Sequence, residues 1–136
     1  MTNREMKSKV MALGNRLAAK GNDRSAAFVR AWQIVKSGSL EIAVKGVAFG
    51  NRQEALRRLA AYEPAKIKAV LVPEPTNPVD PAAVAVMVGV NGGRGLFRLG
   101  YVPRTMTREV AAIRNQLPTI RILDGDIRGA RLALAV

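Results

Sequence analysis

The sequence predicts an α+β protein: a small, partly closed β-barrel or curled sheet of about six strands with two covering helices, preceded by an N-terminal two-helix segment. Two observations predict this fold class. Apolar residues recur at helical spacing before residue 39, and they alternate at strand spacing in several short runs after it. Hairpin-type turns join these runs, with few parallel crossovers. The predicted domains are therefore residues 1–39 and residues 40–136.

The N-terminal segment predicts two helices separated by a turn. Asn22 or Asp23 is expected to cap the second helix, which ends at Gly38 as its C-cap. Phe28 and Trp32 lie four residues apart on this helix, so we expect both rings to pack in a core rather than to stack on bases. Each helix carries one apolar stripe, formed by Met6, Val10, Leu13 and Leu17 in the first and by Phe28, Ala31, Trp32 and Val35 in the second.

The second domain predicts short strands, two helices and three turns. One helix is expected over residues 51–62, where Asn51 and Glu54 resemble a capping box. The other helix begins with Thr105 as its N-cap, and its inner face comprises Met106, Val110, Ile113 and Leu117. The strands are expected at residues 40–48, 66–72, 83–88, 96–102, 119–123 and 128–136. The turns are expected at residues 73–81, 89–95 and 124–126, which are rich in proline, glycine or aspartate.

The charge balance indicates a polyanionic partner. Among the 136 residues, 22 are Lys or Arg and 10 are Asp or Glu, which gives a formal net charge of +12. Residues 1–39 hold eight basic and two acidic residues, and residues 40–136 hold 14 and eight. Each part therefore carries +6, and the charge is densest in the shorter N-terminal part. Nucleic acid is the most frequent partner of such a protein.

The missing residue types exclude several classes of function. The chain has no cysteine and no histidine, which excludes disulfides, thiolate nucleophiles, most zinc sites and the usual neutral-pH general base. The carboxylates are scattered, and no base other than Lys could activate the serines. We therefore predict no enzyme activity, no catalytic residue, no metal site and no cofactor. No apolar run could span a bilayer and no secretory signal is present, so we expect a cytoplasmic protein without a membrane partner.

The most distinctive stretch is residues 73–86, with the sequence PEPTNPVDPAAVAV, followed by LGYVP at residues 99–103. Proline restricts the residue before it to extended conformations, so Asn77 and Asp80 are held extended. Two polar side chains are thereby placed on a stiff loop between buried strands, which is one way to build a binding site. Asx residues before proline also start ordinary turns, and the residue types alone favour that simpler interpretation.

Taken together, these segments resemble the HIRAN domain, which occurs at the N-terminus of some Swi/Snf-type DNA translocases and as a free-standing bacterial module. The resemblance covers about residues 40–136 and rests on residues 46–49, 70–72, 74–80, 83–86 and 99–103. It implies an OB-like barrel that binds single-stranded DNA with a preference for a free 3′ end. It also implies a role in DNA repair or replication.

The resemblance implies roles for individual residues. Phe49 matches an aromatic residue that stacks on a terminal base, and Thr76 and Asn77 match a polar pair of the loop. Asp80 matches the acceptor of the terminal 3′-hydroxyl, and Arg104 matches a basic residue that contacts phosphate. An ionised carboxylate accepts the hydroxyl proton and repels phosphate, so an acid within a basic rim recognises an end. The predicted DNA-binding residues are Phe49, Arg52, Thr76, Asn77, Asp80, Arg98, Tyr101 and Arg104.

The chain departs from the family pattern at two places. Val79 stands where the family often has Tyr or Phe, which removes one stacking ring. Ala48 and Gly50 flank Phe49, where the family can have a basic residue and a second aromatic residue. Stacking contributes roughly 1–3 kcal/mol per base, so the loss of one or two rings is expected to weaken end binding about ten-fold or more.

The leading prediction is a nucleic-acid-binding module for single-stranded DNA or DNA ends. Three alternatives stay open: an adaptor that recruits a helicase or nuclease without binding DNA, a duplex binder whose helix at residues 24–36 enters the major groove, and an RNA-binding barrel. The N-terminal helices have three open roles. They could add non-specific phosphate contacts, form a homodimer through residues 1–39, or dock to a partner protein.

Overall fold

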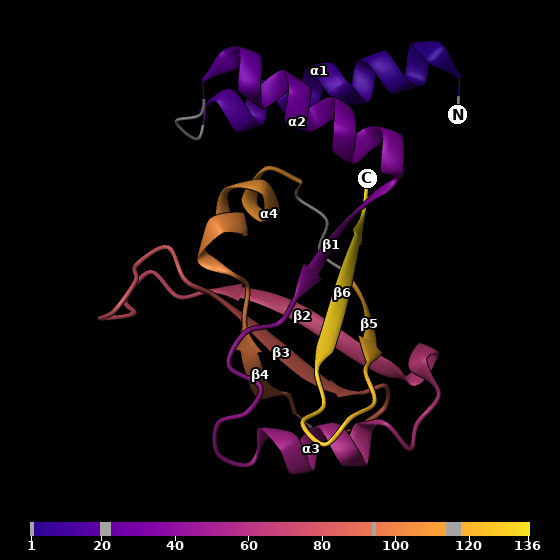
Figure 1. The fold of residues 1–136 in the computed structure, drawn as a ribbon, viewed down its shortest axis with the longest axis vertical. Helices are drawn as coiled ribbons and strands as arrows, with labels where there is room; N and C mark the ends of the chain where they lie inside the picture. The colour runs from indigo at the N-terminus through magenta and orange to yellow at the C-terminus, as the bar shows by residue number, and fades with distance from the viewer. Residues whose placement is uncertain (1, 20–22, 94, 114–117) are drawn as a thin grey trace. The chain divides into compact units, whose positions relative to one another are not determined.

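The computed structural model describes residues 2–19, 23–93, 95–113 and 118–136. Gly21, Asn22 and Leu117, which the sequence assigns to a turn and a helix face, lie outside these described residues. The helices are α1 (Asn3–Ala19), α2 (Arg24–Ser37), α3 (Arg52–Leu59) and α4 (Thr107–Ile113), with 3-10 helices η1 (Pro64–Lys66) and η2 (Arg104–Met106). The strands are β1 (Ser39–Ala43), β2 (Ile67–Pro73), β3 (Val84–Val90), β4 (Phe97–Tyr101), β5 (Thr119–Ile122) and β6 (Ala130–Ala135) (Figure 1). The α+β class is confirmed.

The chain divides into two compact units. The helical unit comprises the described residues of 1–40, 108–115 and 134–136, and the sheet unit comprises those of 41–107 and 116–133. Both units combine segments that are distant in the sequence. The predicted domains, residues 1–39 and 40–136, stay a prediction. Over the described ranges, no helix is both long enough and apolar enough to cross a membrane.

In the helical unit, α1 and α2 pack closely against each other. Their contact uses small residues: a Cβ added to Gly14 would lie 2.6 Å from a ring carbon of Phe28. Asp23 caps α2 by accepting a hydrogen bond from the Ala26 N–H at 3.1 Å, and Gly38 ends the helix with a φ of 87°. Both predicted caps are confirmed. The buried faces comprise Val10, Leu13, Gly14 and Leu17 of α1 and Ala27, Ala31, Ile34 and Val35 of α2.

The predicted core packing of the two α2 rings is wrong for Trp32, which is 44% exposed, and only partly correct for Phe28, which is half-buried. The close approach of α1 and α2 explains this difference. The buried face of α2 contains Ala27 and Ala31, whose small side chains let the two helices come together. A bulky indole one position beyond Ala31 is then left at the margin of the contact.

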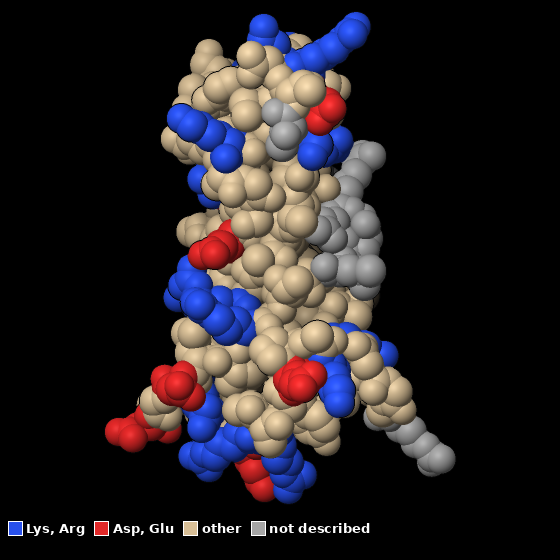
Figure 2. All heavy atoms as spheres, turned by 90° about the vertical axis from the view of Figure 1, so that its right-hand side faces the viewer, with Lys and Arg blue, Asp and Glu red and all other residues tan. Residues whose placement is uncertain are grey.

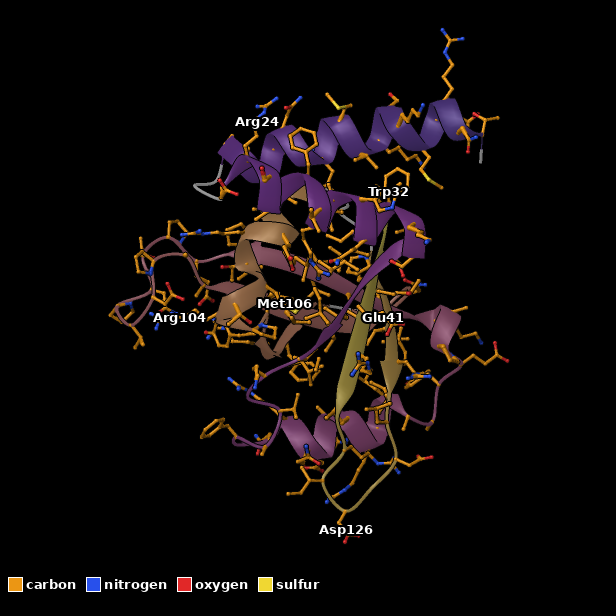
Figure 3. All side chains as sticks on the ribbon, turned by 45° about the horizontal axis from the view of Figure 1, so that its top comes forward. Arg24, Trp32, Glu41, Arg104, Met106 and Asp126 are labelled. Atoms are coloured by element: carbon orange, nitrogen blue, oxygen red, sulfur yellow. The ribbon has the colours of Figure 1, made fainter. Side chains whose placement is uncertain are left out.

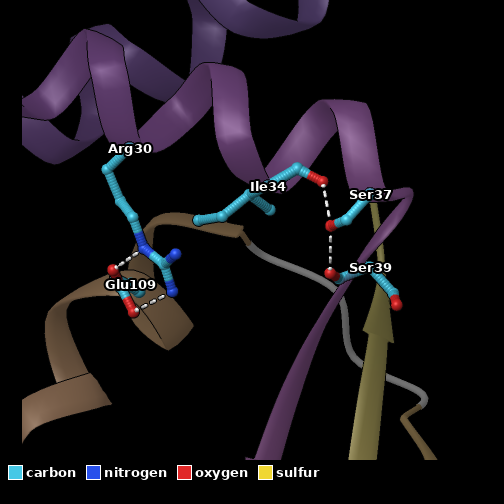
Figure 4. Close-up of polar contacts among 5 residues, drawn as sticks. All are labelled: Arg30, Ile34, Ser37, Ser39 and Glu109. Carbon is cyan, nitrogen blue, oxygen red and sulfur yellow. Dashed lines mark hydrogen bonds and ion pairs between the residues drawn. The ribbon is translucent and has the colours of Figure 1, made fainter.

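Polar contacts join α4 to the other helices within this unit. Arg30 of α2 forms a bidentate ion pair with Glu109, and Arg16 of α1 donates from Nε to the Ala112 carbonyl. Figure 4 shows the Arg30–Glu109 pair together with Ser37, whose hydroxyl lies 2.9 Å from the carbonyl oxygens of both Ile34 and Ser39. The Ser37 hydroxyl therefore stabilises the turn between α2 and β1.

The strands form two antiparallel three-stranded sheets, with the orders β1-β6-β5 and β2-β3-β4. The register between β3 and β4 shifts at a β-bulge, where Val86 pairs with Gly100 and Met87 pairs with Arg98. Because of this shift, Arg98 and Tyr101 project from the same face of β4. Helix α3 buries Leu56 and Leu59 and packs against β4. The core of the sheet unit includes Ile42, Leu56, Val86, Val88, Leu99 and Leu132.

Within the described ranges, the strand pairing does not close a barrel. Among the described residues, an isolated antiparallel bridge between Lys45 and Tyr101 connects the two sheets, and β2 and β5 lie side by side. Strand β1 ends at Ala43 rather than at residue 48, because the chain turns at Gly46 with a φ of 80°.

Two predicted helix starts are also corrected. Asn51 precedes α3, but its side chain makes no capping hydrogen bond, and Glu54 instead pairs with Arg58 at 2.9 Å. The capping-box prediction is therefore wrong, because the Asn51 side chain does not cap α3 and Glu54 pairs with Arg58. Thr105 lies inside η2 and is not the N-cap of α4. The Pro103 position before η2 explains this shift, since the chain first makes a 3-10 turn after the proline.

Candidate nucleic-acid interface

The candidate site begins with the loop between β2 and β3. The Glu74 N–H donates to the Ala83 carbonyl at 2.8 Å, which closes the loop at its base. Within the loop, the Asn77 N–H donates to the Glu74 carbonyl at 3.0 Å, and the Ala83 N–H donates to the Asp80 carbonyl at 3.0 Å. The proline-rich sequence therefore folds into consecutive tight turns and not into an open loop.

Side chains of the loop hold its backbone from the inside. The Asn77 Oδ1 accepts hydrogen bonds from the N–H groups of Val79, at 2.9 Å, and Asp80, at 3.1 Å. The Asp80 Oδ1 accepts one from the Ala82 N–H at 2.9 Å. Both are Asx-type contacts, as turn chemistry predicts. One oxygen of the Asp80 carboxylate is thereby fixed against the backbone, which orients the other.

Glu74 connects this loop to β4. Its Oε1 accepts hydrogen bonds from Asn77 Nδ2 at 3.1 Å and from the Tyr101 hydroxyl at 2.9 Å, and its Oε2 lies 2.6 Å from Arg98 Nη2. The Arg98 guanidinium also lies over the Tyr101 ring, 5.7 Å from its centroid. The sequence-based prediction missed Glu74. No signal in the neighbouring sequence marked it, because its partners Arg98 and Tyr101 lie on β4.

These contacts shift two pKa values in opposite directions. Hydrogen bonds from Asn77 and Tyr101, together with the charge of Arg98, lower the pKa of Glu74 below its ordinary value of 4.5, against an opposing effect of burial. Burial and the hydrogen bond to Glu74 raise the pKa of Tyr101 above its ordinary value of 10.0, while the charges of Arg98 and Arg52 oppose the rise. Both shifts favour an ionised Glu74 carboxylate and a protonated, neutral Tyr101 hydroxyl.

We expect acid to weaken the sheet unit partly through Glu74. Its lowered pKa means that its contribution to folding is fully present above pH 4.5 and is lost as the pH falls through the folded-state pKa. Denaturant unfolding of the wild type and of Glu74→Gln, at about pH 7 and about pH 3, measures the effect. The wild type should lose more stability between the two pH values than the variant. Equal losses would contradict the assignment.

A pocket of about 400 Å³ lies between this loop and the residues that follow β4. Asp80 faces Arg104 across it, with 3.4 Å between Asp80 Oδ2 and Arg104 Nε. The Asp80 side chain is 20% exposed and the Arg104 side chain is 77% exposed, so the carboxylate is the recessed partner. Figure 3 shows Arg104 beside the loop. The pocket is lined by Asn77, Val79, Asp80, Ala83, Tyr101, Val102 and Arg104.

A second group of candidate residues lies on the turn after β1 and at the start of α3. Phe49 is 71% exposed, and the Arg52 guanidinium lies 6.0 Å from the centroid of its ring. Arg52 also donates from Nη1 to the Gly46 carbonyl at 2.6 Å. The Lys45–Tyr101 bridge and the effect of Arg52 on the pKa of Tyr101 place this turn close to the pocket.

Gly100 allows this turn to approach β4. A Cβ at Gly100 would lie 2.2 Å from the Lys45 carbonyl oxygen and 2.8 Å from Val44 Cγ1, distances that no side chain can tolerate. The backbone of Lys45 meets that of Tyr101 through two hydrogen bonds of 2.8 Å and 2.9 Å. The glycine of the Gly-Tyr-Val-Pro segment is therefore required by close packing of two backbones.

The structure brings most of the predicted residues into one region of the sheet unit. Asn77, Asp80, Tyr101 and Arg104 line the pocket, and Arg98 reaches it through Glu74. Phe49 lies on the adjoining turn and Arg52 begins α3, while Thr76 is exposed on the loop and does not line the pocket. Figure 2 shows that Lys and Arg side chains are spread over one face of the molecule with acidic side chains between them. On that face the positive charge does not form a single patch.

The comparisons with known proteins agree with the resemblance drawn from the sequence. The family model of the HIRAN domain matches residues 38–122, a range that contains every predicted site residue. No curated protein and no solved structure matches the chain. Because the family match covers more than half of the 136 residues, the chain belongs to the HIRAN domain family, whose members are nucleic-acid-binding modules.

Proposed function

We propose that the protein binds single-stranded DNA and prefers free 3′ ends, which it holds in the pocket between the β2–β3 loop and the end of β4. The observation that carries this proposal is the Asp80–Arg104 pair within that pocket, with 3.4 Å between Asp80 Oδ2 and Arg104 Nε. An acid next to a base offers an acceptor and a cation to the same ligand. A nucleotide with a free 3′-hydroxyl needs both.

The chemistry of a DNA end supports this pairing. The Asp80 Oδ1 accepts the Ala82 N–H, and Oδ2, which faces Arg104, keeps a second lone pair for a hydroxyl donor. The same negative charge repels a phosphate at that position, which disfavours an internal nucleotide or a 3′-phosphate. Arg104 is exposed and can hold the phosphate that precedes the terminal nucleotide. Phe49, which is 71% exposed, supplies an aromatic surface on which a base can stack.

The test compares 3′-hydroxyl and 3′-phosphate forms of the same single-stranded oligonucleotide, with a closed circle as a strand that has no end. We expect the wild type to bind the hydroxyl form most tightly. Asp80→Asn keeps an oxygen for the Ala82 N–H but removes the charge, so it should weaken binding of the hydroxyl form roughly ten-fold. Its affinities for the phosphate form and the circle should be unchanged or higher. Fluorescence anisotropy with labelled oligonucleotides measures these affinities.

The matched control is Asp126→Asn, which removes one negative charge from the exposed turn between β5 and β6. It changes the net charge by the same amount as Asp80→Asn, and it should leave the preference for the hydroxyl form intact. The proposal is overturned if Asp80→Asn lowers the affinity for all three ligands equally. Binding that requires duplex DNA or RNA would instead favour the helical duplex binder or the RNA-binding barrel.

We further propose that the two sheets curl into a partly closed, OB-like barrel and that the protein is a binding module and not an enzyme. The Lys45–Tyr101 bridge and the neighbouring positions of β2 and β5 support the curled arrangement. A module that binds DNA ends without altering them would recruit an enzyme that acts on the DNA, and we propose a helicase or nuclease as this partner. Failure of the protein to bind any of the nucleic acids would favour the pure adaptor.

A further inference from the structure

A groove lies on the sheet unit between α3 and the hairpin that joins β3 to β4. Two adjoining pockets form it, with volumes of about 540 Å³ and 450 Å³. Four residues line both pockets, so the two are continuous: Leu59, Tyr62, Val90 and Phe97. None of these residues lines the Asp80 pocket. The groove is therefore a separate concave surface that the proposed recognition of an end does not use.

The groove presents aromatic and apolar surface to solvent. Tyr62 is 47% exposed and Leu96 is 39% exposed, and the ring of Phe97 is half-buried in the groove wall. Tyr62 follows the last turn of α3, where its N–H donates to the Leu59 carbonyl at 3.0 Å. This hydrogen bond fixes the main chain at Tyr62, and the ring is exposed. Such a ring is a suitable surface for base stacking, because every base has an aromatic face.

The helix that forms one wall of the groove, α3, carries net positive charge. Helix α3 holds Arg52, Arg57 and Arg58 against a single acid, Glu54. The side chain of Arg58 is 76% exposed, and its Nη2 lies 2.9 Å from Glu54 Oε1. Glu54 is 60% exposed and lines the groove beside Arg58. A phosphate that approaches the groove therefore meets an arginine that is paired only at the surface, where ion pairs are weak.

Helix α3 also connects the groove to the proposed end pocket. Its first residue, Arg52, lies over Phe49 and acts on the pKa of Tyr101. Its last residue, Leu59, lines the groove. A helix of eight residues is about 12 Å long, a length that a few nucleotides of an extended strand can cover. A strand whose 3′ end occupies the pocket can follow α3 and reach the groove.

We propose that this groove is a second nucleotide-binding site, which holds bases a few positions upstream of the 3′ end of the same single strand. The bases stack on Tyr62 and contact Phe97, and Arg58 holds a neighbouring phosphate. The direction of the strand in this proposal rests on the proposed function, which places the 3′ end in the Asp80 pocket. We assign a single strand as the occupant because the groove combines exposed aromatic surface with an exposed arginine, Arg58, a combination that is typical of single-strand binding.

The test is a length series of 3′-hydroxyl oligonucleotides from about two to about eight nucleotides, which extends from below the usual site sizes of single-strand-binding modules into their lower range. We expect the affinity of the wild type to rise with length until the groove is filled. Tyr62→Ala should abolish this gain, with a loss of roughly five-fold or more for the longest strands and none for the shortest. Tyr62→Phe keeps the ring and should keep the gain. Ile127→Ala, which truncates a residue that is 69% exposed in the β5–β6 turn, is the matched control.

Glu54→Gln tests the role of Arg58 without shortening any side chain. It frees Arg58 from its ion pair, so it should strengthen binding of long strands about two-fold and leave the shortest unaffected. The proposal is overturned if Tyr62→Ala lowers the affinity for short and long strands equally, or if the wild type gains nothing with length. The proposed end recognition fails separately, when the shortest strands bind equally with a 3′-hydroxyl and a 3′-phosphate.

Discussion

Gly100→Ala is expected to destabilise the protein by about 3 kcal/mol, because its methyl group has no room and cannot be accommodated by a side-chain movement. The nearest atom is the Lys45 carbonyl oxygen, at 2.2 Å from the added Cβ. That oxygen accepts the Tyr101 N–H at 2.9 Å, so moving it breaks the hydrogen bonds between the two backbones. Thermal unfolding should show a fall in Tm on the order of 10 °C.

Gly129→Ala is the matched control for this substitution. A Cβ at Gly129 would lie 3.4 Å from Leu123 Cδ1, which is an ordinary contact with a flexible side chain. This variant should unfold close to the wild type or slightly above it, because alanine lowers the entropy of the unfolded chain. An unchanged Tm for Gly100→Ala would show that Lys45 and Tyr101 do not approach each other as closely as the bridge requires.

Glu74→Gln should loosen the whole β2–β3 loop, although the substitution preserves the size of the side chain. Glu74 accepts hydrogen bonds from Asn77, Tyr101 and Arg98, and a neutral amide cannot satisfy three donors as a carboxylate does. Once Asn77 is released, the N–H groups of Val79 and Asp80 lose their acceptor. We expect faster hydrogen exchange at these two amides. Binding of 3′-hydroxyl strands should weaken roughly ten-fold, because the residues that position the binding loop are no longer held in place.

Glu41→Gln controls for the loss of an ordinary ion pair. Glu41 lies 3.5 Å from Arg131 and its side chain is 66% exposed, so its removal should change neither the exchange of the loop amides nor binding. Hydrogen exchange also separates two explanations of weaker binding. If Glu74→Gln weakened binding while the Val79 and Asp80 amides stayed protected, Glu74 would act on the ligand directly and would not position the loop.

The predictable part of the fold is the part that local pattern decides. The buried positions Val10, Leu13 and Leu17 of α1, the Asp23 cap and the Gly38 C-cap all follow from spacing and residue type, and the structure confirms them. The exposure of Trp32 could not be predicted, because it depends on how closely α1 and α2 approach. The bulge in β4 is likewise a property of strand pairing, and it alone places Arg98 on the same face as Tyr101.

The candidate site divides in the same way. The sequence predicts Asn77 and Asp80 through their positions before proline, and the structure places both in the pocket wall. Glu74 was missed because its role depends on partners more than 20 positions away, on β4. A carboxylate on a loop of a basic protein carries no local mark of such a connection. Asn77 lies on the same loop, but only the register of β4 brings Arg98 and Tyr101 to Glu74.

The prolines of the β2–β3 loop determine how it can hold a polyanion. Four of the residues from 73 to 83 are proline and have no N–H. Over this described stretch, the N–H of Thr76 is the one that makes no internal hydrogen bond, since the others are donated within the loop by Glu74, Asn77, Val79, Asp80, Ala82 and Ala83. The loop therefore cannot form a cradle of amides like those that hold phosphate in nucleotide-binding loops. The guanidinium groups around it must provide that attraction, so binding should release condensed counterions and weaken steeply as salt rises.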